Sequence, residues 1–479
     1  MPLKKGHIVD VHIEDVAFKG KGVAKLDDLV IFVPRAIPGD QCQIRIVKKK
    51  SSFAEGKILS LLSPSKDRVE ATCSHAHECG GCTWQHVNMA AQRHAKTKIV
   101  RDSIQRTAGL DPAIVQPIIG GDTHLEYRNK MEYSFGDRRW LSDEEIASGK
   151  PLESHGVFAG LHAPGRFDRI LNLQECHLQS SPSWKIVDAV RSWCQNHDIP
   201  AWSPVKQTGW MKHCLIRKGE MTDQWLVNLV TASEESDKMD PLKDHLLAQF
   251  PEITTLVWTI NDSTGPTKLH HKEITLHGPG YIEELLGDVR FRIRPMTFFQ
   301  TNSRQARVLY DVAKAYVEQS RSQLGEESIN TLLDLYCGIG SISQYMHHLA
   351  NQCVGIEINE QSVQEAIENS SRNQLSNVRY VAGDALEWAK RDDWQATIGT
   401  PDVIITDPPR AGMHPELVTF LKERPSPVMV YISCDPMTLS RDLAQLKETY
   451  DIRSIQPVDM FPQTYHIENV CLLHQKTSL

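Results

Sequence analysis

The sequence predicts an α/β protein: a C-terminal doubly wound parallel sheet, preceded by a small N-terminal β-barrel and a central α+β segment. Strand and helix patterns alternate from residue 286 to 479, which is typical of a parallel sheet with helices on both faces. Short alternating segments separated by glycine and proline turns fill residues 1–62, as in small barrels. Residues 63–285 mix helices, strands and polar loops. We therefore expect three domains with these boundaries.

Length and composition fit a soluble protein of several domains. The 479 residues are 40% hydrophobic and 24% charged, which excludes a disordered or fibrous chain. No apolar run approaches the roughly 18 residues that span a bilayer, and no apolar stretch follows the basic N-terminus. We expect a cytoplasmic protein without membrane contact. Eleven cysteines then indicate reduced thiols, metal ligands or a nucleophile rather than disulfides.

The N-terminal segment differs in charge from the rest of the chain. Residues 1–62 contain eleven Lys and Arg against seven Asp and Glu, within a chain of net charge −7. Strands are expected at residues 7–13, 30–34 and 43–47. Small barrels with basic surfaces often bind oligonucleotides, although residues 48–50 alone would also fit a solvated loop.

A glycine-containing loop follows the first strand of the predicted parallel sheet. The strand, residues 331–335, runs into Tyr336-Cys337-Gly338-Ile339-Gly340-Ser341, where glycines let a ligand approach a helix N-terminus. Glu357 ends the next strand, where it can bind ribose hydroxyls, and Asp384 follows the third. Ser343 replaces the third glycine of a dinucleotide site, which disfavours NAD. S-adenosylmethionine needs no pyrophosphate cradle, and the pattern resembles the Rossmann-like fold of class I methyltransferases.

The fourth and fifth strands end in residues suited to a reacting centre. The fourth ends at Asp407-Pro408-Pro409-Arg410, which resembles the motif of amino-group methyltransferases except that arginine replaces their aromatic residue. Cys434 ends the fifth strand. A pyrimidine C5 must be activated by a nucleophile at C6 before methylation, and a cysteine suits that step. Removal of the C5 proton then requires a base, for which Glu468 is the candidate. A buried structural cysteine and an exposed carboxylate are the alternative interpretations.

Five motifs together resemble the RNA uracil-5-methyltransferase family. They are residues 298–302, 334–338, 407–410, 433–436 and 461–468, in the order of the family. The resemblance implies that Cys434 is the nucleophile, Glu468 the base and Phe298 a neighbour of the target uracil. Arg128 and Lys130, in a further motif, would contact the RNA. The resemblance also implies that S-adenosylmethionine is held by Gln300, Tyr336, Ser341, Glu357, Asp384 and Asp407.

Closely spaced cysteines predict a metal site in the central segment. They are Cys73, Cys79 and Cys82. Gly80-Gly81 permits the sharp turn that several ligands on one segment need. Spacing leaves open both an iron–sulfur cluster and a tetrahedral zinc site completed by His75 or His77. The resemblance to ribosomal-RNA members of the family implies a [4Fe–4S] cluster with Cys176 as the fourth ligand.

The N-terminal segment, including residues 18–24 and 33–40, resembles the TRAM domain, an RNA-binding barrel. A TRAM domain together with a cluster implies the branch of the family that acts on 23S ribosomal RNA. We therefore expect S-adenosylmethionine-dependent formation of 5-methyluridine in 23S rRNA by a monomer without a protein partner. The alternatives are a tRNA uracil-5-methyltransferase, an amino-group methyltransferase that relies on residues 407–409, and a non-catalytic RNA-binding module.

Overall fold

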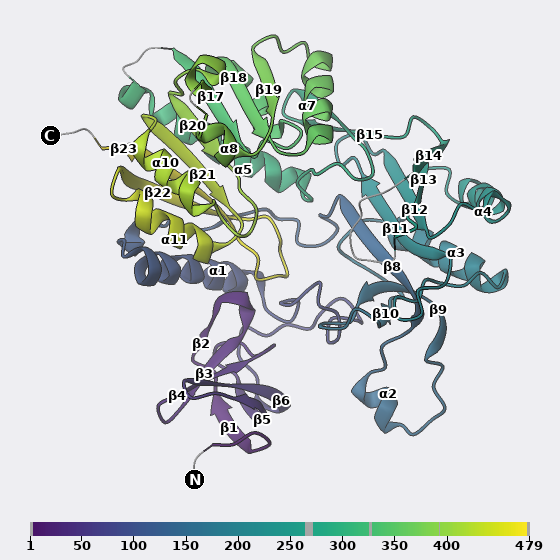
Figure 1. Cartoon of the computed structure of the whole chain (residues 1–479). Helices are drawn as coiled ribbons and strands as arrows, with labels where there is room; N and C mark the ends of the chain where they lie inside the picture. The colour runs from purple at the N-terminus through teal and green to yellow at the C-terminus, as the bar shows by residue number, and fades with distance from the viewer. Residues whose placement is uncertain (1–2, 264–271, 325–327, 392, 477–479) are drawn as a thin grey trace.

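The computed structural model describes residues 3–263, 272–324, 328–391 and 393–476. Figure 1 shows three parts: a barrel at the bottom, a central sheet at the right and a C-terminal sheet at the upper left. This arrangement confirms the predicted α/β class with an N-terminal barrel. Within the described ranges, no helix combines the length and apolar character needed to cross a bilayer.

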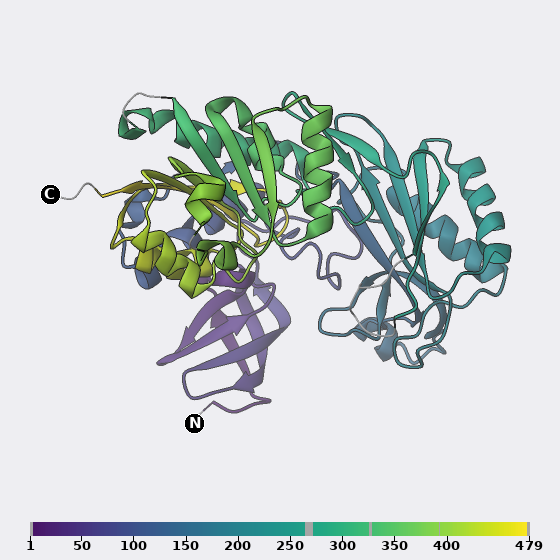
Figure 2. The same ribbon diagram turned by 45° about the horizontal axis from the view of Figure 1, so that its top comes forward.

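The N-terminal part is a six-stranded sheet that closes around one apolar core (Figure 2). Cys42, Ile44 and Ile46 alternate inward along one strand and are buried, as expected for a strand with one covered face. Gly20 has a φ of 73°, and a Cβ there would stand 2.7 Å from Nε1 of Trp84, so glycine is needed where the barrel meets the following segment. The strands in sheet order are β1 (Ile8–His12), β5 (Gln41–Lys49), β6 (Phe53–Ser63), β4 (Leu29–Val33), β3 (Gly22–Leu26) and β2 (Asp15–Val16).

The central part is a seven-stranded sheet with two helices on one face. Figures 1 and 2 show α3 (Ser183–Asn196) and α4 (Ser236–Gln249) on the side away from the C-terminal sheet. Tyr133 and Phe135 pack toward these helices, and the intervening Ser134 therefore faces the opposite side of the sheet. The strands in sheet order are β10 (Ile170–Asn172), β9 (His155–His162), β8 (Lys130–Arg138), β11 (Met211–Lys218), β12 (Trp225–Thr231), β13 (Ile253–Ile260) and β14 (Lys272–His277).

The C-terminal part is an eight-stranded sheet with helices on both faces. Its strands in sheet order are β19 (Val378–Ala382), β18 (Ala350–Glu357), β17 (Ile329–Leu335), β20 (Val403–Thr406), β21 (Val428–Ser433), β23 (Glu468–Gln475), β22 (Tyr450–Asp459) and β7 (Ile119–Gly120). The strands from β19 to β21 are parallel, and β23 is antiparallel to both of its neighbours. Because parallel strands all end at one edge, this order brings their carboxyl ends together.

Two apolar cores sandwich the C-terminal sheet. On one face lie α10 (Pro415–Glu423) and α11 (Pro436–Leu446), and on the other lie α5 (Ser303–Gln319) and α6 (Ser341–Tyr345). A hairpin connects this part to the central sheet. The remaining elements are the hairpin strands β15 (Ile282–Leu286) and β16 (Val289–Ile293) with α2 (Asp143–Ala147), α7 (Glu360–Arg372), α8 (Ala385–Ala389) and α9 (Trp394–Ile398).

Helix α1 (Met89–Ser103) and strand β7 pack on the C-terminal sheet, although the chain continues from them into the central sheet. Ile99 and Val100 of α1 are buried in the same core as α10 and α11. β7 extends the C-terminal sheet as its edge strand, parallel to β22. The segment that contains α1 and β7 therefore contributes to the C-terminal fold. The sequence-based division instead placed all of residues 63–285 in the central domain.

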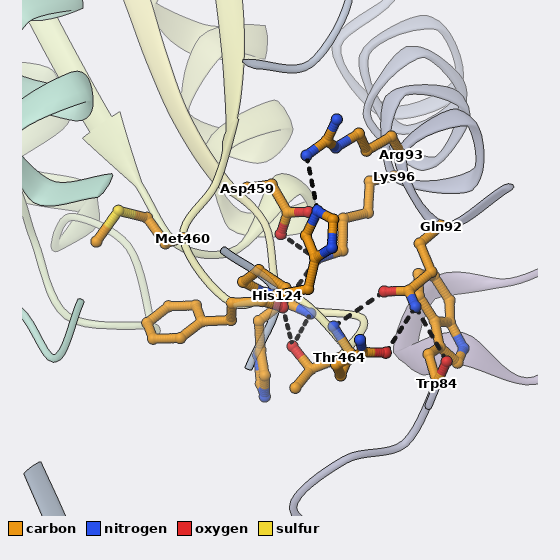
Figure 3. A network of polar contacts seen from close by, with 12 residues as sticks. Trp84, Gln92, Arg93, Lys96, His124, Asp459, Met460 and Thr464 are labelled. Atoms are coloured by element: carbon orange, nitrogen blue, oxygen red, sulfur yellow. Dashed lines mark hydrogen bonds and ion pairs between the residues drawn. The ribbon is translucent and has the colours of Figure 1, made fainter. Parts of the chain in front are cut away.

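A buried polar network fixes α1 to the loop between β22 and β23 (Figure 3). Nζ of Lys96 lies 2.5 Å from Oδ1 of Asp459, with both side chains fully buried, and also donates to the carbonyl oxygen of Phe461. The side-chain amide of Gln92 donates to the Gln463 side chain at 2.9 Å, and the Gln463 backbone N–H donates back to Gln92 at 2.9 Å. The loop of residues 460–467 is thus held by side chains that lie far away in the sequence.

We predict that Lys96→Met lowers the urea midpoint of unfolding, because it leaves the Asp459 carboxylate buried without its cation, a loss of about 3–5 kcal/mol. Lys96→Met combined with Asp459→Leu should recover much of that loss, since two apolar side chains then replace the pair. Lys390→Met, which breaks an exposed pair with Glu416, is the control and should leave the midpoint unchanged. A single Lys96→Met variant as stable as the wild type would contradict the prediction.

Candidate active site

The loop after β17 takes a tight shape that depends on its glycines. Tyr336, Gly338 and Gly340 have φ angles of 63°, 55° and 72°, in the left-handed region. A Cβ at Gly340 would lie 2.2 Å from the hydroxyl oxygen of Tyr380. Glycine at this position therefore lets α6 begin directly after the loop. Tyr336 is half-buried, and burial raises the pKa of its hydroxyl to about 12, so it is neutral at physiological pH.

Glu357 and Asp384 stand at the ends of β18 and β19, beside this loop. One carboxylate oxygen of Glu357 accepts from the Gly338 N–H at 3.0 Å, and the other accepts from the Asn359 N–H at 2.8 Å. Asp384 accepts from the Leu386 N–H at 2.9 Å and caps α8. The structure thus brings the loop and both predicted acids to the carboxyl edge of the sheet, where doubly wound folds bind ligands.

Asp334, which the sequence analysis did not assign individually, carries a buried oxygen with an unmet hydrogen bond. Its Oδ2 accepts from the Ser343 N–H at 3.1 Å, while its Oδ1 has no partner within the described parts of the chain. Burial raises the pKa of this carboxyl to about 7. A cationic group would satisfy the free oxygen, so this acidic edge fits the predicted S-adenosylmethionine. Ser341, at the start of α6, shares a 3.0 Å hydrogen bond with Tyr310.

Cys434 and Glu468 come together from neighbouring strands. Cys434 directly follows β21 and Glu468 begins β23, and these strands pair with Ser433 opposite Asn469. The side-chain amide of Asn469 donates to the carbonyl oxygen of Ser433 at 3.3 Å, which ties the two strand ends. Asp407 directly follows β20, the other neighbour of β21. The three predicted side chains therefore meet at one edge of the sheet.

The electrostatics of this group favour the neutral forms of its members. Burial, followed by the charges of Glu468 and Asp407, raises the pKa of the Cys434 thiol to about 12. Burial raises the pKa of Asp407 to about 7 and that of Glu468 well above its usual range. Arg410 opposes the shifts of Cys434 and Glu468. Positive charge brought to this group would lower all three pKa values, so the site is adapted to a cationic ligand.

The segment that carries Gln300 is held by the central part of the chain. Nε2 of Gln300 lies 3.5 Å from Oδ2 of Asp407. The buried Asn129 donates from its side-chain amide to the Gln300 carbonyl oxygen and to Oγ of Ser303, both at 2.8 Å, and its backbone N–H donates to Thr301. Sequence reasoning singled out the charged neighbours of Asn129 and missed this residue. In the sequence it is an uncharged polar residue between two cations, and in the structure its side chain is buried.

The predicted RNA-contacting residues lie near the same segment. Phe298 is 67% exposed, so its ring is available to a substrate. Arg128 is half-buried with its guanidinium 5.8 Å from the centre of the Phe461 ring. Lys130 is half-buried at the start of β8, opposite Arg217 of β11. An exposed aromatic ring and two cations thus lie next to the segment that carries Gln300 and the Asn129 side chain that holds it.

The four predicted metal-binding cysteines lie within electrostatic reach of one another. Burial first, and the neighbouring thiols in addition, raise the pKa of Cys73 to about 11 and that of Cys82 to about 12. Ser74 donates from its N–H and hydroxyl to Glu175 at 2.9 and 2.8 Å, which joins the Cys73–Cys82 segment to Cys176. Across the described ranges, however, no three or more His, Cys, Asp or Glu side chains are arranged as a metal-ion site.

The fold and the edge of the sheet define a class I methyltransferase. Residues 274–476 match the sequence model of tRNA (Uracil-5-)-methyltransferases, and residues 2–59 match the TRAM domain. The chain belongs to the RNA uracil-5-methyltransferase family, which confirms the resemblance in the sequence.

Relatives and a solved structure are similar to this chain over nearly its full length. An RNA methyltransferase of Porphyromonas gingivalis is 36% identical over 475 residues, 98% of this chain and 100% of the relative. One of Chlorobaculum tepidum is 36% identical over 472 residues, 98% of this chain and 96% of the relative. The crystal structure of Pyrococcus abyssi tRNA (uracil-54, C5)-methyltransferase in complex with S-adenosyl-L-homocysteine superimposes with a TM-score of 0.72. Its sequence is 26% identical, and the match covers 97% of this chain and 99% of that one.

We predict that iodoacetamide alkylation of Cys434 in the ligand-free protein increases about tenfold per pH unit from pH 7 to 10 without a plateau, because a thiol with a pKa of about 12 is largely protonated there. Arg410→Gln should slow alkylation at each pH, since it removes the positive charge that lowers this pKa. Arg391→Gln, which removes a cation from an exposed pair, is the matched control. Mass spectrometry of the Cys434 peptide measures the rates, and a plateau below pH 8 would refute the expected pKa.

Proposed function

We propose that this protein methylates C5 of a uridine in 23S ribosomal RNA, with Cys434 as nucleophile and Glu468 as base. The observation that carries the proposal is the meeting of a thiol and a buried carboxylate at adjacent ends of β21 and β23. Gln300 and Asp407 lie beside them. Family membership supplies the RNA substrate class, and the pair of side chains supplies the two functions that a pyrimidine C5 requires.

The first step that the chain performs is addition. The Cys434 thiol gives its proton to water, and Sγ forms a bond to C6 of the uracil while the C5–C6 electron pair moves to C5 and O4. S-adenosylmethionine, when bound, supplies an electrophilic methyl group to C5. Arg410 stabilises the thiolate through its charge. Phe298, Arg128 and Lys130 would orient the RNA around the target base.

The second step removes the covalent link. The Glu468 carboxylate takes the proton from C5, the C5–C6 double bond forms again, and Sγ leaves as a thiolate. Burial holds the pKa of Glu468 above its usual range, which suits a group that first accepts a proton and then releases it. The acids at the sheet edge would hold the cofactor. In this proposal the cofactor residues are Gln300, Tyr336, Ser341, Glu357, Asp384 and Asp407.

The choice of ribosomal RNA rests on two features outside the reacting centre. One is the TRAM domain, and the other is the group of four cysteines, for which we propose a [4Fe–4S] cluster. A tetrahedral zinc ion draws sulfur ligands to within about 4 Å of one another. A cube of four irons and four sulfides holds its thiolates on separate irons, farther apart. The chain provides four neighbouring thiols, which is the ligand set that such a cluster takes.

Transfer RNA is the second candidate substrate, because the archaeal structure that matches nearly the whole chain is a tRNA (uracil-54, C5)-methyltransferase. That similarity includes the barrel as well as the catalytic part, so the TRAM domain alone does not separate the two RNAs. The two substrates can be separated by experiment.

We predict that 23S rRNA containing 5-fluorouridine forms a complex with the protein and S-adenosylmethionine that survives denaturing electrophoresis, because fluorine cannot leave C5 as a proton does. Cys434→Ala should abolish the complex, whereas Cys353→Ala, a buried strand cysteine, should not. Glu468→Gln should accumulate a methylated adduct on ordinary RNA, since the C5 proton stays in place.

The same assay with 5-fluorouridine tRNA decides between the substrates. A complex with tRNA alone would replace the ribosomal substrate. Methylation that persists in Cys434→Ala would indicate amino-group chemistry, and RNA binding without methyl transfer in the wild type would indicate a non-catalytic module.

We predict that protein purified without oxygen contains about four irons and four acid-labile sulfides per chain, and that Cys176→Ala loses most of both. Cys194→Ala, a buried cysteine outside the group, should retain them. One zinc per chain and no sulfide would refute the cluster.

A further inference from the structure

The open face of the central sheet contains a pocket that the proposed reaction does not use. Its volume is about 510 Å³. Ser134 of β8, Asn228 of β12 and Thr259 of β13 contribute to its floor, on the face opposite α3 and α4. Figures 1 and 2 show those helices on the side away from the C-terminal sheet, so the pocket lies on the face toward the C-terminal sheet.

Aromatic side chains with a neighbouring cation border the pocket. Trp202 is half-buried, and Nζ of Lys212 lies 4.1 Å from the centre of its ring. Lys212 is fixed by hydrogen bonds to the carbonyl oxygens of Asn261 and Ser263, at 2.7 and 2.8 Å. Phe167, also in the lining, is 70% exposed. Flat aromatic surfaces of this kind are what unpaired RNA bases stack on.

The floor contains a polar group without a partner. Oδ1 of Asn228 accepts from the Thr259 hydroxyl at 2.8 Å. Nδ2 of the same fully buried side chain has no hydrogen-bond partner in the ranges that the structure describes. Buried donors of this kind are uncommon and call for an explanation. A ring nitrogen or carbonyl oxygen on a base edge is an acceptor of suitable chemistry.

The pocket and the active site share one segment of chain. Met296 lines the pocket, and Phe298 lies two residues further on. Two residues span at most about 7 Å, which is comparable to the step between neighbouring nucleotides in an extended strand. Arg217 is buried and donates to the carbonyl oxygens of Pro295, at 3.0 Å, and of Thr297, so it holds this segment at two points.

We propose that this pocket binds an unpaired base of the RNA substrate, one of the nucleotides next to the target uridine. This inference rests on the proposed function. The base stacks on Trp202 with Phe167 at the rim, and its edge meets the Asn228 amide. The pocket would then select the RNA by a nucleotide that the reaction does not change.

The test uses an RNA stem–loop that contains the target uridine. In each RNA, 2-aminopurine replaces one of the nucleotides that flank it. Binding to the full-length protein with S-adenosyl-L-homocysteine should quench the fluorescence at one position, because stacking on indole quenches 2-aminopurine. Trp202→Ala should abolish that quenching and weaken binding about tenfold, whereas Trp202→Phe should retain most of the affinity. Trp184→Ala, a half-buried tryptophan on α3 beyond the sheet, is the matched control.

The outcomes separate this inference from the proposed function. Normal methylation and binding by Trp202→Ala, or quenching that this variant keeps, would overturn the pocket and leave the reaction intact. Absence of methyl transfer in the wild type would overturn the proposed function and with it the RNA ligand. Binding of S-adenosyl-L-homocysteine by Trp202→Ala as tight as in the wild type shows that the variant is folded.

Discussion

The buried ion pair between Lys96 and Asp459 is the constraint on which the rest of the active site depends. Asp459 ends β22, and the loop that follows returns to Glu468 at the start of β23. A loop of this kind would have many conformations if only its own backbone held it. Lys96 and Gln92 of α1 fix it at both Asp459 and Gln463, so a helix encoded far upstream determines where the proposed base stands. The barrel joins the same network, since the Trp84 indole donates to the carbonyl oxygen of Gly20.

The reacting centre gathers three acidic groups whose ionised forms are costly to bury and which a cationic ligand would stabilise. Cys434, Asp407 and Glu468 are acids crowded at one edge, and burial raises the pKa of each, so burial opposes their ionised forms. A cationic sulfonium is the kind of ligand that this edge stabilises most. In the proposed reaction, binding of the cationic cofactor would therefore also favour the thiolate form of Cys434.

Much of the C-terminal fold could be predicted from sequence because parallel strands buried on both faces leave continuous apolar runs. The strand predicted at residues 331–335 forms as Ile329–Leu335, and Glu357 ends the following strand as predicted. Motif residues at strand ends were predictable for the same reason. The role of Asn129 and the attachment of α1 were not, because they depend on contacts between residues more than a hundred positions apart, for which one sequence carries no periodic pattern.

The placement of β7 and α1 shows that one domain of this chain is inserted into another. The chain leaves the C-terminal sheet after Gly120, builds the central sheet, and returns through the hairpin of Ile282–Leu286 and Val289–Ile293. The central sheet is therefore a guest inserted into a host domain whose two halves are separated in sequence. The match of residues 274–476 to the family begins in the last strand of the central sheet and covers the larger half of that host. A guest of this kind can be exchanged or reshaped to suit a new RNA while the catalytic host keeps its geometry.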